Sequence, residues 1–299
     1  MSTEPVAKVR LEVVPSRDLA AQLPLVYAPP GAVSITCLPH HGPSRTVAAT
    51  VELAGLGYHV VPHLAARSIA SRAELYGLLE QLGQAGVTEL FLVAGDRRGP
   101  AGPYSWSGPL MEDVRGFSPE FSMGIAGYPE GHPALTPHQL RSGLESKSAL
   151  ATSLVTQMCF SAESIARYIE NLRGLGIEIP VWVGVPGFIS TKKLLSMGAR
   201  LGVGRSLKLA RGTGLARVLW SRRDFDSNRL VRDIQCRLAG DPMFAGFHVY
   251  TFNELGRLPN VLNGPAASEM SARPGDRKAY PLHLAQTRRD HHHGLQSPS

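Results

Sequence analysis

Cysteine is scarce in this 299-residue chain. Its three cysteines, Cys37, Cys159 and Cys236, stand far apart, which excludes a disulfide framework and a thiolate metal site. Isolated thiols in odd number are typical of a reducing compartment. No stretch approaches the roughly 18 apolar residues of a membrane span, and the opening MSTEPVAKVR lacks the apolar core of a signal peptide. We therefore expect a cytoplasmic protein that does not enter the membrane.

Dense runs of charge are also missing. Lys and Arg together number 31 against 24 Asp and Glu, giving a net charge of +7 and a pI near 9.5. The basic residues are scattered, and aromatic residues do not alternate with them as they do in grooves for single-stranded nucleic acid. We therefore expect no nucleic-acid partner. A small polyanionic ligand and simple solubility explain the charge about equally well.

The chain does contain a series of short apolar segments. Eight of them are rich in β-branched residues and almost continuously apolar, as parallel strands covered on both faces are. They cover residues 9–15, 32–38, 58–66, 89–95, 121–128, 153–160, 180–187 and 246–252. Helical spacing of apolar residues appears between them at 44–57, 71–86, 161–176, 190–202 and 226–240. This alternation predicts a single (β/α)8 barrel.

The predicted barrel occupies residues 1–263. From 264 to 299 the sequence loses its periodicity, and we expect a flexible basic tail there. Within the barrel, the Pro- and Gly-rich interval 97–120 has room for one short helix near 108–115. We expect this interval to form an active-site loop.

Polar residues at the predicted strand ends are the candidate site, because barrel enzymes carry their reacting groups there. Glu12 and Asp96 are the least expected of these, since a carboxylate in a barrel strand loses hydration and raises its pKa or recruits a cation. The uncharged candidates are Thr36, His40, His41, His63, Tyr128, His132, Gln157, His248 and Tyr250. A single member such as Thr36 or Gln157 is more often structural. Taken together, the set predicts an active-site pocket.

Two other kinds of site have weaker support. The histidines and Asp96 are of the residue types that bind zinc, but no His-x-His stands on the first strand and no histidine pair has helical spacing. We therefore assign no metal. GVGRS at 202–206 follows a helical pattern, and no GxGxxG opens a helix after the first strand, so a Rossmann site is not predicted.

Several motifs, in order, resemble the 5,10-methylenetetrahydrofolate reductase family over about residues 9–262. GYPEGHP at 127–133 is the most specific of them. RLEVVP resembles the family's Phe-Glu-Phe-Phe-Pro strand, HLAAR its His-Leu-Thr-Cys segment, VAGD its Leu-Arg-Gly-Asp, and VTQMCF its Ile-Thr-Gln-Phe-Phe-Phe. SITCLPHHGPSRT resembles its second strand. The family is a (β/α)8 barrel that passes hydride from NAD(P)H, normally through FAD, to methylenetetrahydrofolate in one-carbon metabolism and methionine biosynthesis.

The resemblance implies a role for each matching residue. Glu12 and Asp96 are the catalytic pair: Glu12 takes the place of the acid, and Asp96 also contacts the substrate. Gln157 matches the pterin-binding glutamine. The residues placed against the cofactor are Thr36, His63, Ala126, Tyr128, His132 and Lys147. A desolvated Glu12 with a raised pKa suits protonation of the departing folate nitrogen, which agrees with this assignment.

The chain departs from the family pattern where the flavin phosphates would lie. Ala94 stands in place of an arginine, Gln139 in place of an acidic ribose contact, and Lys147 is one residue out of register. Because the ring-facing residues are kept, we expect NADH or NADPH to deliver hydride directly, with FAD bound weakly or not at all. No ribose-reading motif separates NADH from NADPH.

Other readings stay open. One is a non-catalytic folate-binding or regulatory relative, although binding alone does not need Glu12. Another is a flavin-dependent barrel oxidoreductase acting on proline or on an aryl methyl ether. The oligomeric state is not predicted.

Overall fold

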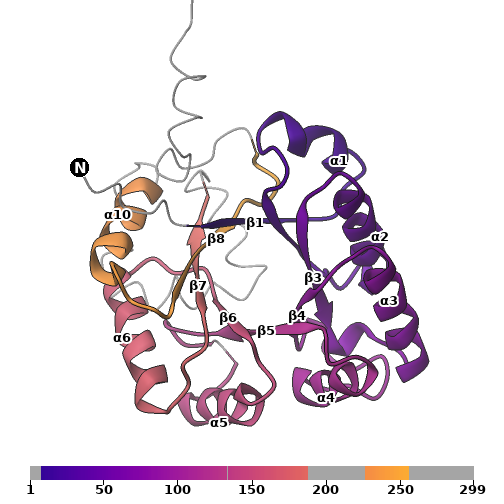
Figure 1. Ribbon diagram of the computed structural model, residues 1–299. Coiled ribbons are helices and arrows are strands. Elements are labelled where there is room, and N and C mark those ends of the chain that lie inside the picture. Colours follow the sequence, from indigo (N-terminus) through magenta and orange to yellow (C-terminus); the bar gives the residue numbers. More distant parts are fainter. Residues whose placement is uncertain (1–7, 133, 188–225, 256–299) are drawn as a thin grey trace, which may run out of the picture. The chain divides into compact units, whose positions relative to one another are not determined.

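Eight parallel strands pair in chain order and close into a barrel (Figure 1). The computed structural model describes residues 8–132, 134–187 and 226–255. The strands are β1 (Val9–Val13), β2 (Ala32–Ile35), β3 (His59–Ala65), β4 (Glu89–Val93), β5 (Ser122–Gly127), β6 (Ser153–Thr156), β7 (Val181–Pro186) and β8 (Phe244–Tyr250). The predicted (β/α)8 barrel is confirmed.

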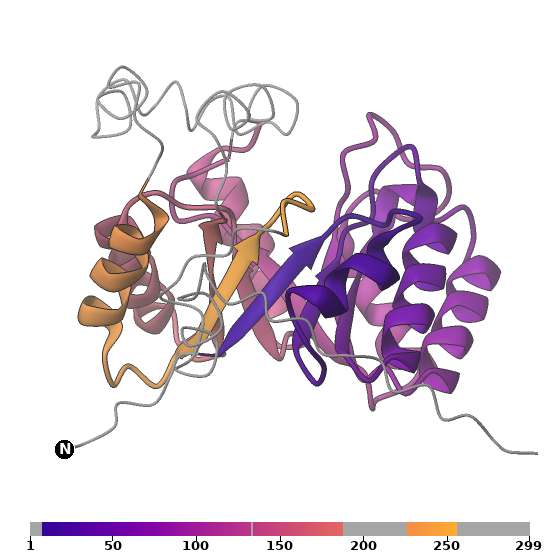
Figure 2. The ribbon, with the colours of Figure 1, turned by 90° about the horizontal axis from the view of Figure 1, so that it is seen from above.

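Helices lie outside the ring of strands (Figures 1 and 2). They are α1 (Leu19–Gln22), α2 (Gly42–Gly55), α3 (Arg72–Gln84), α4 (Ser107–Phe117), α5 (Pro137–Ser148), α6 (Ala162–Gly174) and α10 (Ser227–Leu238), with short 3-10 turns η1 (Leu23–Leu25) and η2 (Ala66–Ser68). The helix expected at 190–202 and the tail at 264–299 lie outside the described residues. In the described ranges no helix is long and apolar enough to cross a membrane.

Local capping explains where several helices begin. Ser71 and Ser161 accept hydrogen bonds from backbone N–H groups three residues on, which starts α3 and α6 as predicted. Helix α2 begins earlier than predicted, at Gly42. Gly42 has a φ of +70°, which glycine adopts without strain, and Pro43 in the first turn favours the helix.

The interval expected to be an active-site loop is only partly a loop. Helix α4 fills its second half, and the buried Tyr104 donates a hydrogen bond to Asp113 at 2.6 Å. Arg72 of α3 pairs with the same carboxylate at 2.9 Å. These contacts fasten the end of the loop against α3 and α4.

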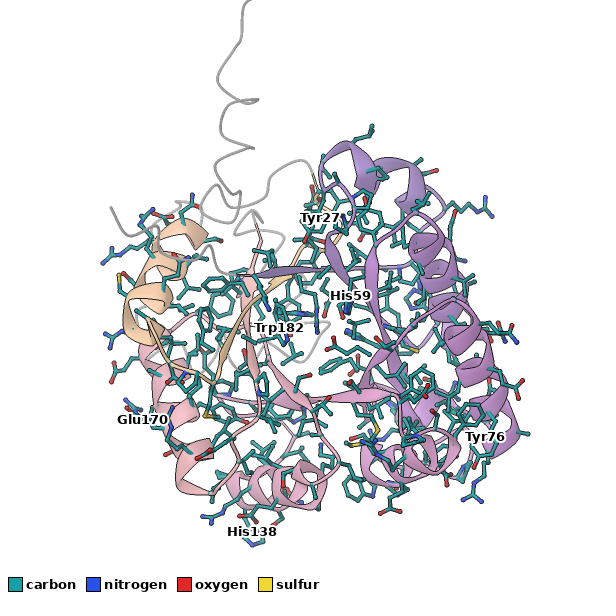
Figure 3. The ribbon with its side chains drawn as sticks, viewed as in Figure 1. Tyr27, His59, Tyr76, His138, Glu170 and Trp182 are labelled. Atoms are coloured by element: carbon teal, nitrogen blue, oxygen red, sulfur yellow. The ribbon has the colours of Figure 1, made fainter. Side chains whose placement is uncertain are left out.

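The barrel has an apolar layer inside as well as outside its strands. Most of the core lies between strands and helices, whereas Val61, Phe91 and Val155 pack together inside with Ala126 and Trp182. Figure 3 places Trp182 within the ring of strands. Among the described residues, this inner layer occupies part of the barrel interior.

Candidate active site

Glu12 shares one of its carboxyl oxygens with two histidines. Its Oε2 lies 3.0 Å from His248 Nε2 and 3.7 Å from His63 Nε2. His248 is fully buried, while the Glu12 side chain keeps 14% of its surface exposed. Burial raises the pKa of Glu12 to about 7, although the neighbouring His63 lowers it. A carboxyl group with this pKa gains and loses a proton near neutrality.

The two histidines stay neutral at that pH. Burial lowers the pKa of His63 to about 4 and that of His248 to about 3. Ser34 donates to the Val61 carbonyl at 3.2 Å, so its oxygen is available to accept from His63 Nε2 at 2.8 Å. Glu12 is therefore the member of the cluster able to act as a proton donor or acceptor near pH 7.

A second cluster forms after β4 and β5. The rings of Tyr128 and His132 meet edge to face with centroids 5.1 Å apart. Burial raises the pKa of Tyr128, and the Asp96 carboxylate raises it further; for His132, burial lowers the pKa and Asp96 opposes that shift. The Asp96 carboxylate therefore acts electrostatically on both of these side chains. Gly95, with a φ of +82°, allows the chain to turn just before Asp96.

Thr36 and Gln157 each follow directly after a strand. The strands predicted to run to 38 and 160 end earlier, at Ile35 and Thr156, so that expectation was wrong. Both residues still donate their backbone N–H to a neighbouring strand end, to Val13 at 3.0 Å and to Gly127 at 2.8 Å. Their side-chain atoms Thr36 Oγ1 and Gln157 Nε2 are buried and have no partner among the described residues. Such atoms favour a bound polar ligand.

Two further residues connect these groups: Tyr250, a candidate from the sequence, and Gly184, which was not one. Tyr250 donates to the Thr156 carbonyl at 3.0 Å, and its ring meets His248 edge to face at 5.0 Å. Gly184 passes so close to β6 that a Cβ there would lie 2.4 Å from the Thr156 oxygen and 2.6 Å from the Gln157 oxygen. The only sequence signal for this approach is a glycine inside a strand.

The remaining residues expected at the cofactor are Ala126, Lys147 and Gln139, and each of them contacts other parts of the protein. Ala126 belongs to the inner apolar layer. Lys147 extends toward α4, where its Nζ lies 3.5 Å from Ser107 Oγ, and burial lowers its pKa. Gln139 caps its own helix: its Oε1 accepts from the Thr136 backbone N–H at 2.9 Å.

Glu130, in the middle of GYPEGHP, ties the loop after β5 to the start of α6. Its Oε1 accepts from the backbone N–H groups of Phe160 and Ser161 at 2.9 and 3.2 Å. A carboxylate suits this position because the helix N-terminus carries partial positive charge. Gly131, with a φ of +79°, then turns the chain. The motif thus fixes the loop that carries Tyr128 and His132.

Glu130→Ala is expected to lower the free energy of unfolding by about 1–2 kcal/mol, because two backbone donors lose this acceptor. Glu130→Gln keeps an acceptor oxygen and is expected to retain most of the stability. Urea denaturation measures both variants. Glu170→Ala, at an exposed position of α6 (Figure 3), is the control and is expected to change stability by less than about 0.5 kcal/mol. Equal effects of the Glu130→Ala and Glu170→Ala changes would refute the capping role.

The fold and these clusters define a class: a (β/α)8 barrel with a buried carboxyl–imidazole cluster and unpaired polar atoms toward the carboxyl ends of its strands, where barrel enzymes hold their ligands. Among the described residues, no group of three or more His, Cys, Asp and Glu side chains is arranged to hold a metal ion. The chain belongs to the methylenetetrahydrofolate reductase family, whose sequence model matches residues 25–204.

Curated relatives agree with this membership at modest identity. The chain is 25% identical over 195 residues to "Methylenetetrahydrofolate reductase 2" of Saccharomyces cerevisiae, covering 58% of this chain and 30% of that protein. It is 26% identical over 152 residues to "Probable methylenetetrahydrofolate reductase (NADPH)" of Caenorhabditis elegans, covering 48% and 22%. The aligned part is therefore under a third of either relative's length.

Among solved structures, the chain is similar to a 3-dehydroquinate dehydratase from Geobacillus kaustophilus. The TM-score is 0.42 at 14% identity, over 60% of this chain and 74% of that one.

Proposed function

We propose that this chain reduces 5,10-methylenetetrahydrofolate to 5-methyltetrahydrofolate with NADH or NADPH as hydride donor. Glu12 protonates the departing N10 as its bond to the methylene carbon breaks, which leaves a 5-iminium cation. Hydride then adds to the methylene carbon, and a proton from solvent restores Glu12. The negative charge of Asp96 stabilises the cation, and Gln157 binds the pterin edge with its amide, whose Nε2 has no partner among the described residues.

The observation that carries this proposal is the buried Glu12 carboxyl group, whose pKa is raised to about 7, in a chain that belongs to this family. A carboxyl group with a pKa near 7 is matched to proton donation at neutral pH. The two histidines that contact it are neutral, so neither of them keeps it ionised. A protein that only bound folate would have no need of such a group.

The family implies FAD as a cofactor. The residues of this chain suit the flavin ring of FAD but not its phosphates. Thr36 Oγ1 is buried, has no hydrogen-bond partner in the described part of the chain, and is suited to a ring contact. At the phosphate end, Ala94 brings no charge, Gln139 is engaged in capping, and Lys147 lies against Ser107 with a lowered pKa. These features support hydride transfer from nicotinamide to folate without a flavin. On this proposal the nicotinamide takes the place beside His63, Tyr128 and His132.

The expected result is folate-dependent oxidation of NADH or NADPH by a colourless, desalted preparation, at a rate that added FAD does not change. The measurement is the loss of reduced-nicotinamide absorbance with and without methylenetetrahydrofolate, in parallel with a flavin absorbance spectrum. Activity that appears only with FAD would overturn direct transfer and leave the reductase proposal intact. No oxidation under either condition would overturn the reductase proposal and favour a folate-binding relative.

A further inference from the structure

The two oxygens of the Glu12 carboxyl group have different surroundings. Both neighbouring imidazoles approach Oε2, with His248 Nε2 at 3.0 Å and His63 Nε2 at 3.7 Å. Oε1 makes no hydrogen bond to any residue in the described ranges. The 14% of the Glu12 side chain that stays exposed leaves the group open to a ligand. Oε2 is therefore engaged by the two histidines, and Oε1 is available to a ligand.

We propose that His248 is a positioning residue: its Nε2–H donates to Glu12 Oε2 and thereby holds the transferable proton on Oε1. This rests on the proposed function, in which Glu12 is the acid. A carboxylic acid has a single proton. Because Oε2 already faces a donor, protonation there would set two hydrogens against each other, so the proton resides on Oε1.

The tautomer of His248 follows from its two ring nitrogens. Nδ1 is buried and has no partner among the described residues, whereas Nε2 faces a carboxyl oxygen. A buried N–H without an acceptor is costly, so the single hydrogen of the neutral ring belongs on Nε2. Arg10, the strand neighbour of His248 on β1, opposes a second proton on the ring. His248 therefore remains a donor to Oε2 at neutral pH.

Three charged or titratable groups around the cluster, His63, Tyr250 and Arg10, keep one state near pH 7. His63 on β3 is neutral, and Tyr250 on β8 has a pKa raised by burial and by Glu12. Arg10 on β1 is held by both oxygens of Glu89 on β4, at 2.8 and 2.9 Å. A pH dependence near neutrality therefore reports on Glu12 itself.

The test compares His248→Phe, which removes the donor, with His248→Gln, whose amide nitrogen can take the place of Nε2. One readout is the pKa of the Glu12 carboxyl group in the free protein, from an infrared difference titration in which Glu12→Gln supplies the blank. The other is the pH profile of kcat and KM for folate-dependent NAD(P)H oxidation. The control is His59→Phe, half exposed at the start of β3 (Figure 3).

In His248→Phe the Glu12 pKa is expected to rise by about one unit, because the carboxylate loses a hydrogen bond. The alkaline limb of kcat moves with it, and kcat falls about tenfold with KM changed less than about threefold. His248→Gln restores both values, and His59→Phe leaves them unchanged. If His248→Phe fails to fold, His248→Asn, whose shorter amide does not reach Oε2, is expected to give the same shifts.

An unchanged Glu12 pKa in a folded His248→Phe or His248→Asn protein would overturn the positioning role, whatever the activity. A shifted pKa with no folate-dependent oxidation by the wild-type protein would support the positioning role and refute the reductase proposal. A loss of kcat in His248→Phe that His248→Gln does not restore would also count against the role.

Discussion

Glu12→Gln is expected to lower kcat for folate-dependent NAD(P)H oxidation by about 10²–10⁴-fold, the usual contribution of a general acid. Glutamine fills the same space and still accepts from His248 Nε2, but it has no proton to transfer to the departing nitrogen. Affinity for a folate analogue is expected to stay within about threefold, since Gln157 and Asp96 are untouched. Steady-state kinetics and analogue titration measure the two effects separately.

The pH profile provides a second test of the same variant. The wild-type rate is expected to fall as pH rises above about 7, where Glu12 loses its proton, and the residual rate of Glu12→Gln is expected to lack this limb. Glu170→Gln, on the outside of α6, is the control and keeps the wild-type profile. A Glu12→Gln protein with undiminished turnover would exclude Glu12 as the acid.

Stability is expected to change with pH in the same variant. Because the pKa of Glu12 is higher in the folded state than in the unfolded chain, its contribution to stability is present at low pH and is lost as pH rises through about 7. Glutamine does not titrate, so Glu12→Gln lacks this pH-dependent loss. The free energy of unfolding of Glu12→Gln minus that of wild type is therefore expected to increase from pH 5 to pH 8.

The sequence predicted the barrel because its strands are nearly continuous apolar runs separated by helical patterns. It misplaced the ends of β2 and β6, because apolar residues continue past both strands. Cys159 and Met158, for example, are buried in the loop after β6, where Met158 packs with Phe160 and Tyr250. An apolar run alone does not distinguish a strand from a buried loop.

The site was predicted residue by residue but not as a set of contacts. Glu12 was predicted as a buried acid, yet its closest partner, His248, stands 236 positions away in the chain. Barrel closure brings β1 and β8 together, and nothing local to either strand specifies the distance between two particular atoms. The role of Glu130 was not predicted for the same reason, since the backbone N–H groups that donate to it belong to Phe160 and Ser161, just before α6. The position of a residue in a predicted strand indicates which side chains lie at the carboxyl end of the barrel. Which of those side chains contact one another depends on how the strands pack.

Gly184→Ala is expected to damage both stability and ligand binding. The added Cβ would lie 2.4 Å from the Thr156 oxygen, 2.6 Å from the Gln157 oxygen and 2.8 Å from the Tyr250 ring. Two of these neighbours are backbone atoms, so β6 and β7 have to move apart rather than a side chain rotating away. We expect the free energy of unfolding to fall by about 2–3 kcal/mol, at the upper end for an overpacked core.

Binding suffers because Gly184 also sets the position of the Gln157 main chain. The Gly184 backbone N–H donates to Thr156 Oγ1 at 2.8 Å, and Thr156 Oγ1 in turn donates to the Gln157 carbonyl at 2.9 Å. Forcing the strands apart disturbs this chain of hydrogen bonds and moves the unpaired amide of Gln157. Affinity for a folate analogue is expected to fall at least about tenfold, a loss of about 1.4 kcal/mol in binding.

Gly77→Ala is the matched control for this change. Gly77 lies inside α3 with open space around its Cα, so alanine there is expected to raise the free energy of unfolding by about 0.5–1 kcal/mol and leave binding unchanged. Thermal melts and analogue titration of the two variants, made in parallel, separate the effect of replacing a glycine from the effect of placing a methyl group against close neighbours. If Gly184→Ala melts and binds like wild type, the close approach of β7 to β6 does not position Gln157. If it weakens binding as expected, the glycine in β7 determines where the Gln157 amide after β6 lies, as its proposed role in substrate binding requires.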